Sequence, residues 1–302
     1  MVRSRGRRRA ISNLFGWLFV LPFLGAFLVF AVYPLLFSVS LSFTEFGGIR
    51  DPIFIALDNF RALMNDNVFK LSIFNTFWIW IICFVFQVIV AMLLAGLLTY
   101  GRVKGRQVWM SLFYFPNLVS SAVMALLFAN LFNTDVGVIN VFLQGAGVID
   151  APIAFMGNRW ITRGIVSFII FIQFFGVFVI YMSTTMNSIP IEIYESALVD
   201  GCKGRKAFLH ITLPLMRPIL FFIFVTSIVG GMQIFEQPYL LTDTTGAPAN
   251  TTTTLMMYVY RTAFQYHRLG YSAAVAVVTL MIILILAGLV SILNAYLKRK
   301  YI

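Results

Sequence analysis

Charged residues are scarce in this chain: they make up 11% of its 302 residues, whereas soluble proteins carry about 25%. The charges are also segregated, and the ranges 71–98 and 269–297 contain none. With 60% hydrophobic residues and a mean hydropathy of +0.91, this scarcity excludes a soluble domain.

Cysteine and histidine are almost absent, with two residues of each. Cys83 lies in a long apolar range and Cys202 in a polar segment, so the two thiols are not expected to meet. No Cys/His spacing typical of a metal site occurs. These absences exclude a disulfide framework and a structural zinc site.

The chain also lacks its own energy source. No G-x-x-x-x-G-K-[ST] phosphate loop is present, and the range 201–206 (GCKGRK) resembles one only superficially because the spacing is wrong. Ionisable residues, which a proton-coupled carrier needs within the membrane, are nearly missing from the centres of the apolar ranges. Any transport against a gradient would therefore draw its energy from a partner.

What the chain does contain is long apolar ranges. A run of about 20 apolar residues is enough for a helix to cross the hydrocarbon core of a membrane. The sequence predicts an all-α, polytopic membrane protein in which residues 1–302 form a single transmembrane domain. The six predicted spans are about 11–41, 71–100, 108–132, 161–187, 216–242 and 271–296.

The net charge of +11 fits a membrane topology. With both termini in the cytoplasm, most basic residues fall on the cytoplasmic side, as the positive-inside rule predicts, with Glu192, Glu195 and Asp200 as the opposing acids. Topology thus explains the charge without a nucleic-acid partner. The basic residues on that side are Arg3, Arg5, Arg7, Arg8, Arg9, Arg102, Lys104, Arg106, Lys203, Arg205, Lys206, Arg217, Lys298, Arg299 and Lys300.

The N-terminal arginines followed by an apolar run also match the start of a secretory signal. The apolar run from Leu14 continues far beyond a signal's hydrophobic region, and no convincing small-x-small cleavage site closes it. We therefore predict an uncleaved first helix.

The cytoplasmic segment at about 188–215 differs from the other connections. Ser188 and Pro190 are start signals for a helix, and Ile191, Tyr194, Ala197 and Leu198 repeat on one helical face. Gly201 is expected to end this helix with a positive φ. Pro214 is expected to limit a second short helix. The alternative is an amphipathic loop that rests on lipid headgroups through its lysines and arginines.

This loop carries a known spacing. Glu195-Ser196-Ala197, three residues, Gly201, nine residues and then Ile211-x-Leu213-Pro214 resemble the "EAA" coupling loop of the permease subunits of bacterial ABC importers. A serine replaces the middle alanine, which keeps a small residue there. Further segments resemble the carbohydrate-uptake branch, of the maltose and glycerol-3-phosphate type, and the first of its two permease subunits. These are Pro22, Tyr33-Pro34, Ser38, 40–43, 57–60, 115–116, 132–133, 139–140, 241–242, Pro248 and Thr251.

The resemblance implies an ABC type I importer permease in a bacterial cell membrane. Its partners would be a second related permease, two ATPase subunits that bind the ATP and Mg, and an extracellular solute-binding protein. The permease itself would be a transport subunit without cofactors.

Within the family, the loop helix docks into the ATPase. Glu195 would anchor it by charge, Ala197 would allow close approach, and Gly201 would allow the turn. The structural alternatives are that Glu195 is a solvated carboxylate and that Gly201 only ends the helix. The predicted coupling residues are Glu195, Ser196, Ala197, Asp200, Gly201, Ile211, Leu213 and Pro214.

Polar side chains inside the spans are candidates for a sugar pathway, because they are costly unless they face protein or water. By resemblance to the maltose-type permease, the lining comes from the third, fourth and fifth spans, with rings such as Phe174, Phe235 and Tyr239 available to sugar C–H faces. The predicted lining residues are Asn117, Ser121, Gln173, Gly176, Ser227, Gln233 and Glu236.

Each of these residues also has a structural interpretation. Membrane helices use Ser, Asn and Gln to hydrogen-bond one another. Range 236–238 (EQP) is either a kink with a gating role or an exposed helix end, and Gly230-Gly231 is either a close packing contact or a hinge.

The sequence as a whole predicts the transmembrane subunit of an ATP-driven importer for a carbohydrate, with an oligosaccharide as the favoured cargo. The same architecture also suits glycerol-3-phosphate, a polyol or another small solute. An independent secondary carrier is the remaining class, and it would need a mid-membrane carboxylate and two repeated halves that the chain does not show.

Overall fold

The computed structural model describes residues 17–49, 51–101 and 103–301, with side chains up to residue 296. The N-terminal arginines at positions 3, 5, 7, 8 and 9, Arg102, and the side chains of Lys298, Arg299 and Lys300 lie outside this description. The start predicted for the first span, at about residue 11, also lies outside it.

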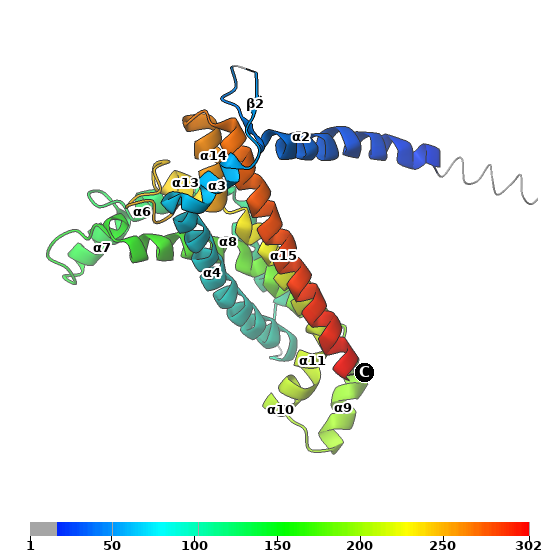
Figure 1. The fold of residues 1–302 in the computed structure, drawn as a ribbon. Coiled ribbons are helices and arrows are strands. Elements are labelled where there is room, and N and C mark those ends of the chain that lie inside the picture. The colour runs from blue at the N-terminus through cyan, green and yellow to red at the C-terminus, as the bar shows by residue number, and fades with distance from the viewer. Residues whose placement is uncertain (1–16, 50, 102, 302) are drawn as a thin grey trace, which may run out of the picture. The chain divides into compact units, whose positions relative to one another are not determined.

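Helices make up most of the described chain (Figure 1). A helix over Trp17–Leu41 contains a π-helical turn η1 (Leu28–Val32) and ends as α2 (Tyr33–Leu41). The following elements are β1 (Thr44–Glu45), β2 (Ile53–Phe54), α3 (Asp58–Asn65), α4 (Asn67–Tyr100), α5 (Arg106–Leu118), α6 (Ser121–Leu131), α7 (Val138–Gly145), η2 (Phe155–Gly157), α8 (Arg159–Asn187), α9 (Ile191–Val199), α10 (Arg205–Ala207), η3 (Phe208–Thr212), α11 (Leu213–Leu215), α12 (Arg217–Met232), α13 (Glu236–Leu241), α14 (Leu255–Tyr260), η4 (Arg261–Gln265) and α15 (Leu269–Tyr301).

Four helices of the described residues are long and apolar enough to cross a membrane: Trp17–Leu41, Asn67–Tyr100, Arg159–Asn187 and Leu269–Tyr296. Two bent pairs raise the number to six if each pair is one span. Arg106–Leu118 and Ser121–Leu131 meet at 87°, and Arg205–Leu215 and Arg217–Met232 meet at 63°. The chain is therefore an all-α, multi-pass membrane protein, apart from one two-residue β ladder.

Two of the predicted spans are not continuous helices. The range 108–132 breaks at Val119, where extended backbone separates α5 from α6 and the Ser120 hydroxyl accepts a hydrogen bond from the Val123 amide. The range 216–242 breaks after Met232, and helix resumes at Glu236. Pro238 is not the cause of this second break, because it lies in the first turn of α13, where a proline removes no intrahelical hydrogen bond.

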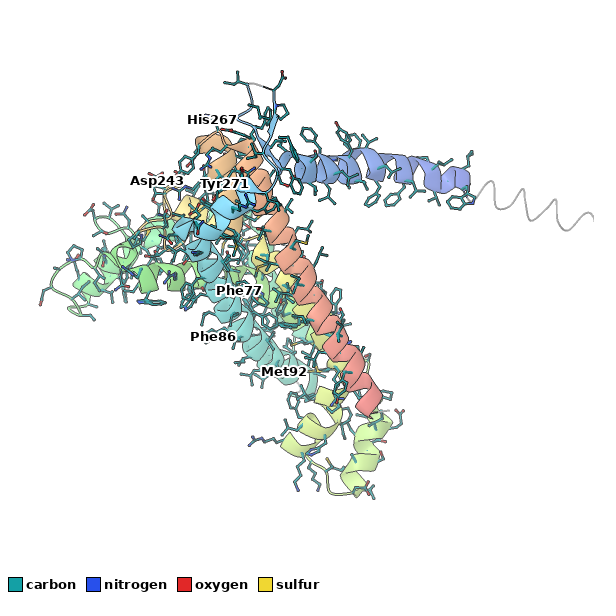
Figure 2. The ribbon with its side chains drawn as sticks, in the orientation of Figure 1. Phe77, Phe86, Met92, Asp243, His267 and Tyr271 are labelled. Carbon is teal, nitrogen blue, oxygen red and sulfur yellow. The ribbon has the colours of Figure 1, made fainter. Side chains whose placement is uncertain are left out.

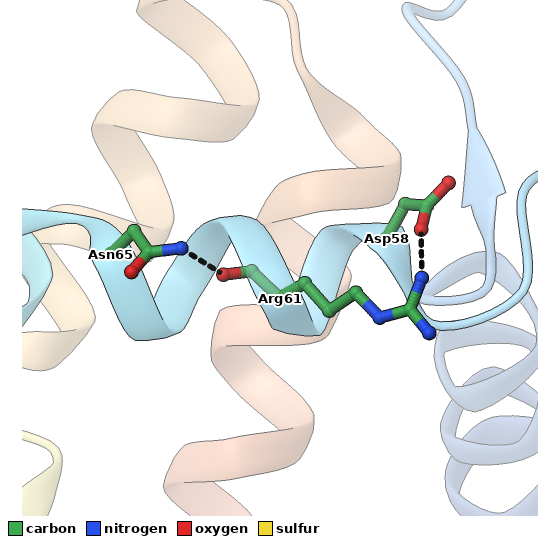
Figure 3. Close-up of polar contacts among 3 residues, drawn as sticks. All are labelled: Asp58, Arg61 and Asn65. Carbon is green, nitrogen blue, oxygen red and sulfur yellow. Dashed lines mark hydrogen bonds and ion pairs between the residues drawn. The ribbon is translucent and has the colours of Figure 1, made fainter.

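The described chain forms two compact units. The smaller unit comprises residues up to Asn65 together with Val259–Val278. In it, the buried Asn59 side chain donates hydrogen bonds to the carbonyl oxygens of Ser42 and Thr44, both at 2.9 Å. The exposed face of α3 carries the Asp58–Arg61 ion pair at 3.0 Å and the Asn65 amide, which donates to the Arg61 carbonyl (Figure 3).

The larger unit, residues 66–258 and 279–302, has a core in which α4 and α8 pack together. Phe77, Phe86 and Met92 mark successive positions along α4 (Figure 2). Near its C-terminal end, Ala91 and Ala95 are fully buried against α8 residues such as Met182. Small residues one turn apart allow two membrane helices to approach closely.

Candidate functional site

The predicted coupling loop folds as two short helical segments beyond the C-terminal end of α4 (Figure 1). α9 begins directly after Pro190, as its start signals predict. It ends in a Schellman motif, in which the Cys202 amide donates to the Ala197 carbonyl and the Gly201 amide to the Leu198 carbonyl. Gly201 has φ +75°, so the predicted glycine turn is confirmed.

The second helical segment runs further than predicted. Helix continues from Arg205 through Pro214 to Leu215, so the prediction that Pro214 limits it is wrong. The reason is the π turn over Phe208–Thr212, in which the Leu213 amide reaches back to the Phe208 carbonyl. A wider turn relieves the clash that a proline ring otherwise has with the carbonyl four residues earlier.

The face predicted for α9 is only half buried. Tyr194 and Ala197 are partly covered, but Ile191 and Leu198 are 62% and 53% exposed, and the neighbouring Val199 is 88% exposed. The charged and small residues of the motif, Glu195, Ser196, Asp200 and Gly201, are exposed as well. The tip of the loop thus presents apolar side chains beside a carboxylate, a mixture typical of a protein-binding surface.

Hydroxyl groups of Tyr194 and Thr212 in this loop and of Tyr100 at the end of α4 lie within hydrogen-bond distance of one another and attach the loop to α4. The Tyr194 hydroxyl lies 2.7 Å from the Tyr100 hydroxyl and 2.8 Å from Thr212 Oγ1. Thr212 is 1% exposed and occupies the variable position between Ile211 and Leu213 of the motif. Sequence reasoning missed Tyr100 and Thr212, although a tyrosine at the end of a span and a threonine inside the motif are visible in the sequence.

The predicted pathway residues fall into two groups. Gln173, Ser121 and Gly176 take part in packing between helices. Asn117 and Ser227 are partly exposed, and Gln233 and Glu236 are exposed on either side of the break between α12 and α13. The structure therefore joins Gln173 and Ser121 by a hydrogen bond, and it places Gln233 and Glu236 at the two ends of the break between α12 and α13.

Gln173 is the centre of the first group and is 3% exposed. Its Nε2 donates to the Val119 carbonyl at 3.0 Å and to Ser121 Oγ at 3.1 Å. Its Oε1 accepts from Gln237 Nε2 at 3.0 Å. This amide thus holds the break between α5 and α6 and the start of α13 against α8; Gln237 was not among the predicted residues.

Two glycines of the spans, Gly176 and Gly231, allow the close approach of neighbouring helices. A Cβ atom at Gly176 would lie 1.9 Å from the Phe113 carbonyl oxygen of α5, and one at Gly231 would lie 2.1 Å from Trp80 Cδ1 of α4. Of the two interpretations of Gly230-Gly231, close packing describes Gly231, whereas a Cβ at Gly230 would meet nothing within 4 Å.

The threonine-rich segment after the fifth span is buried and fixed in place. Thr251–Thr254 are at most 2% exposed and are fixed by side chains of α4 and α8. The reason is that Asn75, Thr76 and Arg163 supply internal partners for a polar stretch that otherwise needs water.

Comparison with known proteins agrees with this architecture. The family described as "binding-protein-dependent transport system inner membrane component" matches residues 87–301. The lactose transport system permease protein LacF of Rhizobium radiobacter is 29% identical, with 95% of this chain and 96% of that protein covered. The arabinooligosaccharides transport system permease protein AraP of Bacillus subtilis is 31% identical, with 90% and 85% covered.

A solved structure shares the fold. The crystal structure of a bacterial ABC transporter involved in the import of the acidic polysaccharide alginate contains a chain with a TM-score of 0.80 and 21% identity, over 97% of this chain and 99% of that one. The resemblance drawn from the coupling-loop motif is thereby confirmed. Since the family model spans well over half of the sequence, the chain belongs to the family of binding-protein-dependent transport system inner membrane components.

Proposed function

We propose that this chain is the transmembrane subunit of an ATP-driven importer for an oligosaccharide in the cell membrane of a bacterium. Six spans with both termini in the cytoplasm would build half of the passage, and a second related permease the other half. An extracellular solute-binding protein would deliver the sugar. The sugar assignment is supported by relatives whose names refer to lactose, arabinooligosaccharides and starch degradation products.

The single observation that supports coupling best is the loop tip. Its α9 helix ends rigidly at Gly201, exposes Val199 and Glu195, and is attached to α4 through hydroxyl groups. Two ATPase subunits would bind the ATP and Mg. One would contact this tip, and the other would contact the corresponding tip of the second permease. Movement of the ATPases would then reach the spans through α9, with Ile211, Leu213 and Pro214 continuing the connection to α12.

For the passage, we propose that Asn117, Ser121, Gln173, Gly176, Ser227, Gln233 and Glu236 lie along the sugar's route. Gln233 and Glu236 are the best supported of these, because both are exposed and lie at the two ends of the break between α12 and α13. Gln173 would act mainly by holding that region together, because its amide is engaged with protein groups.

The test is uptake by vesicles that contain the full complex of both permeases and the ATPases, with the binding protein outside. Lactose, arabinotriose, maltotriose and glycerol-3-phosphate serve as labelled probes. ATP-dependent uptake of one or more saccharides is expected. Uptake of glycerol-3-phosphate alone would favour the second candidate, which the 29% identical permease UgpA of Yersinia enterocolitica suggests; uptake without ATPases would refute both.

A further inference from the structure

Four consecutive threonines, Thr251–Thr254, are buried in the larger unit with exposed fractions of 2% or less. Hydrophilic chain of this kind is stable away from water only when its polar groups find partners. Those partners come from two long helices, α4 and α8. We call Asn75, Arg163 and Thr251–Thr254 together the threonine clamp.

Asn75 of α4 is the hub of the clamp and is fully buried. Its Nδ2 donates to the carbonyl oxygens of Asn250, at 2.8 Å, and Thr253, at 2.9 Å. Its Oδ1 accepts from Arg163 Nη2 at 2.7 Å and from Arg163 Nε at 3.1 Å. One side chain therefore joins α4, α8 and the threonine segment.

Arg163 of α8 is a buried cation with an exposed fraction of 3%. Its Nε also donates to the Thr251 carbonyl at 2.9 Å, and its Cζ lies 4.8 Å from the Trp160 ring centroid and 5.1 Å from that of Phe74. Throughout the described part of the chain, no carboxylate pairs with it. A buried charge is costly unless it is well hydrogen-bonded, so Arg163 strongly favours the arrangement in which the threonine segment stays in place.

The clamp reaches the break between α12 and α13. Thr254 Oγ1 donates to the Ile234 carbonyl at 2.6 Å, inside the stretch that separates the two helices. Thr76 Oγ1, one residue after Asn75, accepts from the Leu255 amide at 2.9 Å. A broken membrane helix leaves backbone groups unsatisfied, and Thr254 supplies the partner for one of them.

We propose that Asn75, Arg163 and Thr254 are positioning residues for transport, which hold the interrupted helix α12–α13 in the geometry that places Gln233 and Glu236 along the solute route. The inference rests on the proposed function. It assigns a transport role to residues that lie outside both the coupling loop and the predicted lining.

The first test measures the clamp directly in the assembled complex. Asn75→Asp keeps an acceptor for Arg163 but removes both amide donations, so the buried cation remains satisfied. Without those two donations we expect amide hydrogen exchange at Thr252–Leu255 to become at least about tenfold faster, because the loss of even one buried hydrogen bond has an effect of this size. Asn65→Ala is the matched control, because the Asn65 amide is exposed on α3 and bonds only to its own helix (Figure 3). Exchange at Thr252–Leu255 should not change in this control.

The second test separates positioning from plain stability. Thr254→Val removes the hydroxyl but keeps the side-chain shape, whereas Thr254→Ser keeps the hydroxyl. In vesicles with the saccharide probes named above, we expect Asn75→Asp and Thr254→Val to lower uptake per ATP hydrolysed about tenfold. Thr254→Ser should keep uptake per ATP hydrolysed near the wild-type value. The amount of ATPase bound should be the same in every variant.

The outcomes are distinct. If the variants lower only the yield of folded complex and leave uptake per ATP unchanged, the clamp is structural and the inference is overturned, even if exchange is faster. If the wild-type complex moves none of the probes, the proposed function itself fails, and the assignment of positioning residues fails with it.

Discussion

The hydroxyl groups of Tyr100 and Tyr194 lie 2.7 Å apart, and their rings meet edge to face with centroids 5.8 Å apart. Tyr100 is the last residue of α4, and Tyr194 lies in the middle of α9. This contact joins the predicted coupling loop to one of the two longest helices of the described chain. It gives the loop a direct route to α4 in addition to its covalent continuation into α12.

Replacing Tyr194 by phenylalanine tests that route. The change removes the hydroxyl that bonds to Tyr100 and Thr212 but keeps the ring, and a hydrogen bond contributes about 1 kcal/mol. We expect uptake per ATP hydrolysed to fall about fivefold, with ATPase binding retained. Thr185→Ala is a suitable control, because the Thr185 hydroxyl bonds only to the Tyr181 carbonyl of its own helix. Equal uptake in Tyr194→Phe and wild type would show that the hydroxyl contact does not transmit motion.

Gly201 offers a test of the loop's shape. Its φ is +75°, and a Cβ added there would meet nothing within 4 Å, so the position penalises side chains through backbone conformation alone. We expect Gly201→Val to disorder the end of α9 and to reduce co-purification of the ATPase subunits. Gly201→Asn should retain most of it, because asparagine tolerates the left-handed region. Full assembly with valine would mean that this turn does not shape the ATPase contact.

Replacement of Gly176 is expected to lower the stability of the protein. An alanine methyl would collide with the Phe113 carbonyl, so α5 must move away from α8; overpacking of this kind costs about 1–3 kcal/mol. We expect Gly176→Ala to lower the melting temperature in detergent. Gly164→Ala in the same helix, where a Cβ meets nothing within 4 Å, should leave the melting temperature unchanged or raise it. A neutral Gly176→Ala would contradict the observed packing.

Gln173 distinguishes a packing role from a sugar-binding role. Gln173→Ala leaves the Gln237 amide without its acceptor, and a buried unsatisfied group costs about 1–3 kcal/mol. We expect a lower melting temperature with little change in KM for the transported saccharide. A raised KM at unchanged melting temperature would instead assign Gln173 to direct sugar contact. Gln144→Ala is the control, because Gln144 is exposed; it should change neither the melting temperature nor the KM.

The sequence determined the membrane class, the positions of the apolar ranges and the coupling-loop motif. These features are local: hydrophobic runs, a proline before α9 and a glycine after it act through neighbouring residues. The same locality explains why the start of α9 after Pro190 was predicted correctly.

Only the tertiary structure decided where the helices break and which polar residues meet. The interruption at 233–235 and the burial of Thr251–Thr254 involve partners up to 179 residues away, such as Thr76 for the Leu255 amide. A polar residue in an apolar sequence shows that it needs a partner, because unsatisfied groups are costly in a membrane. Which partner it finds depends on helix packing, and for Asn75, Arg163 and Gln173 that choice is visible only in the fold.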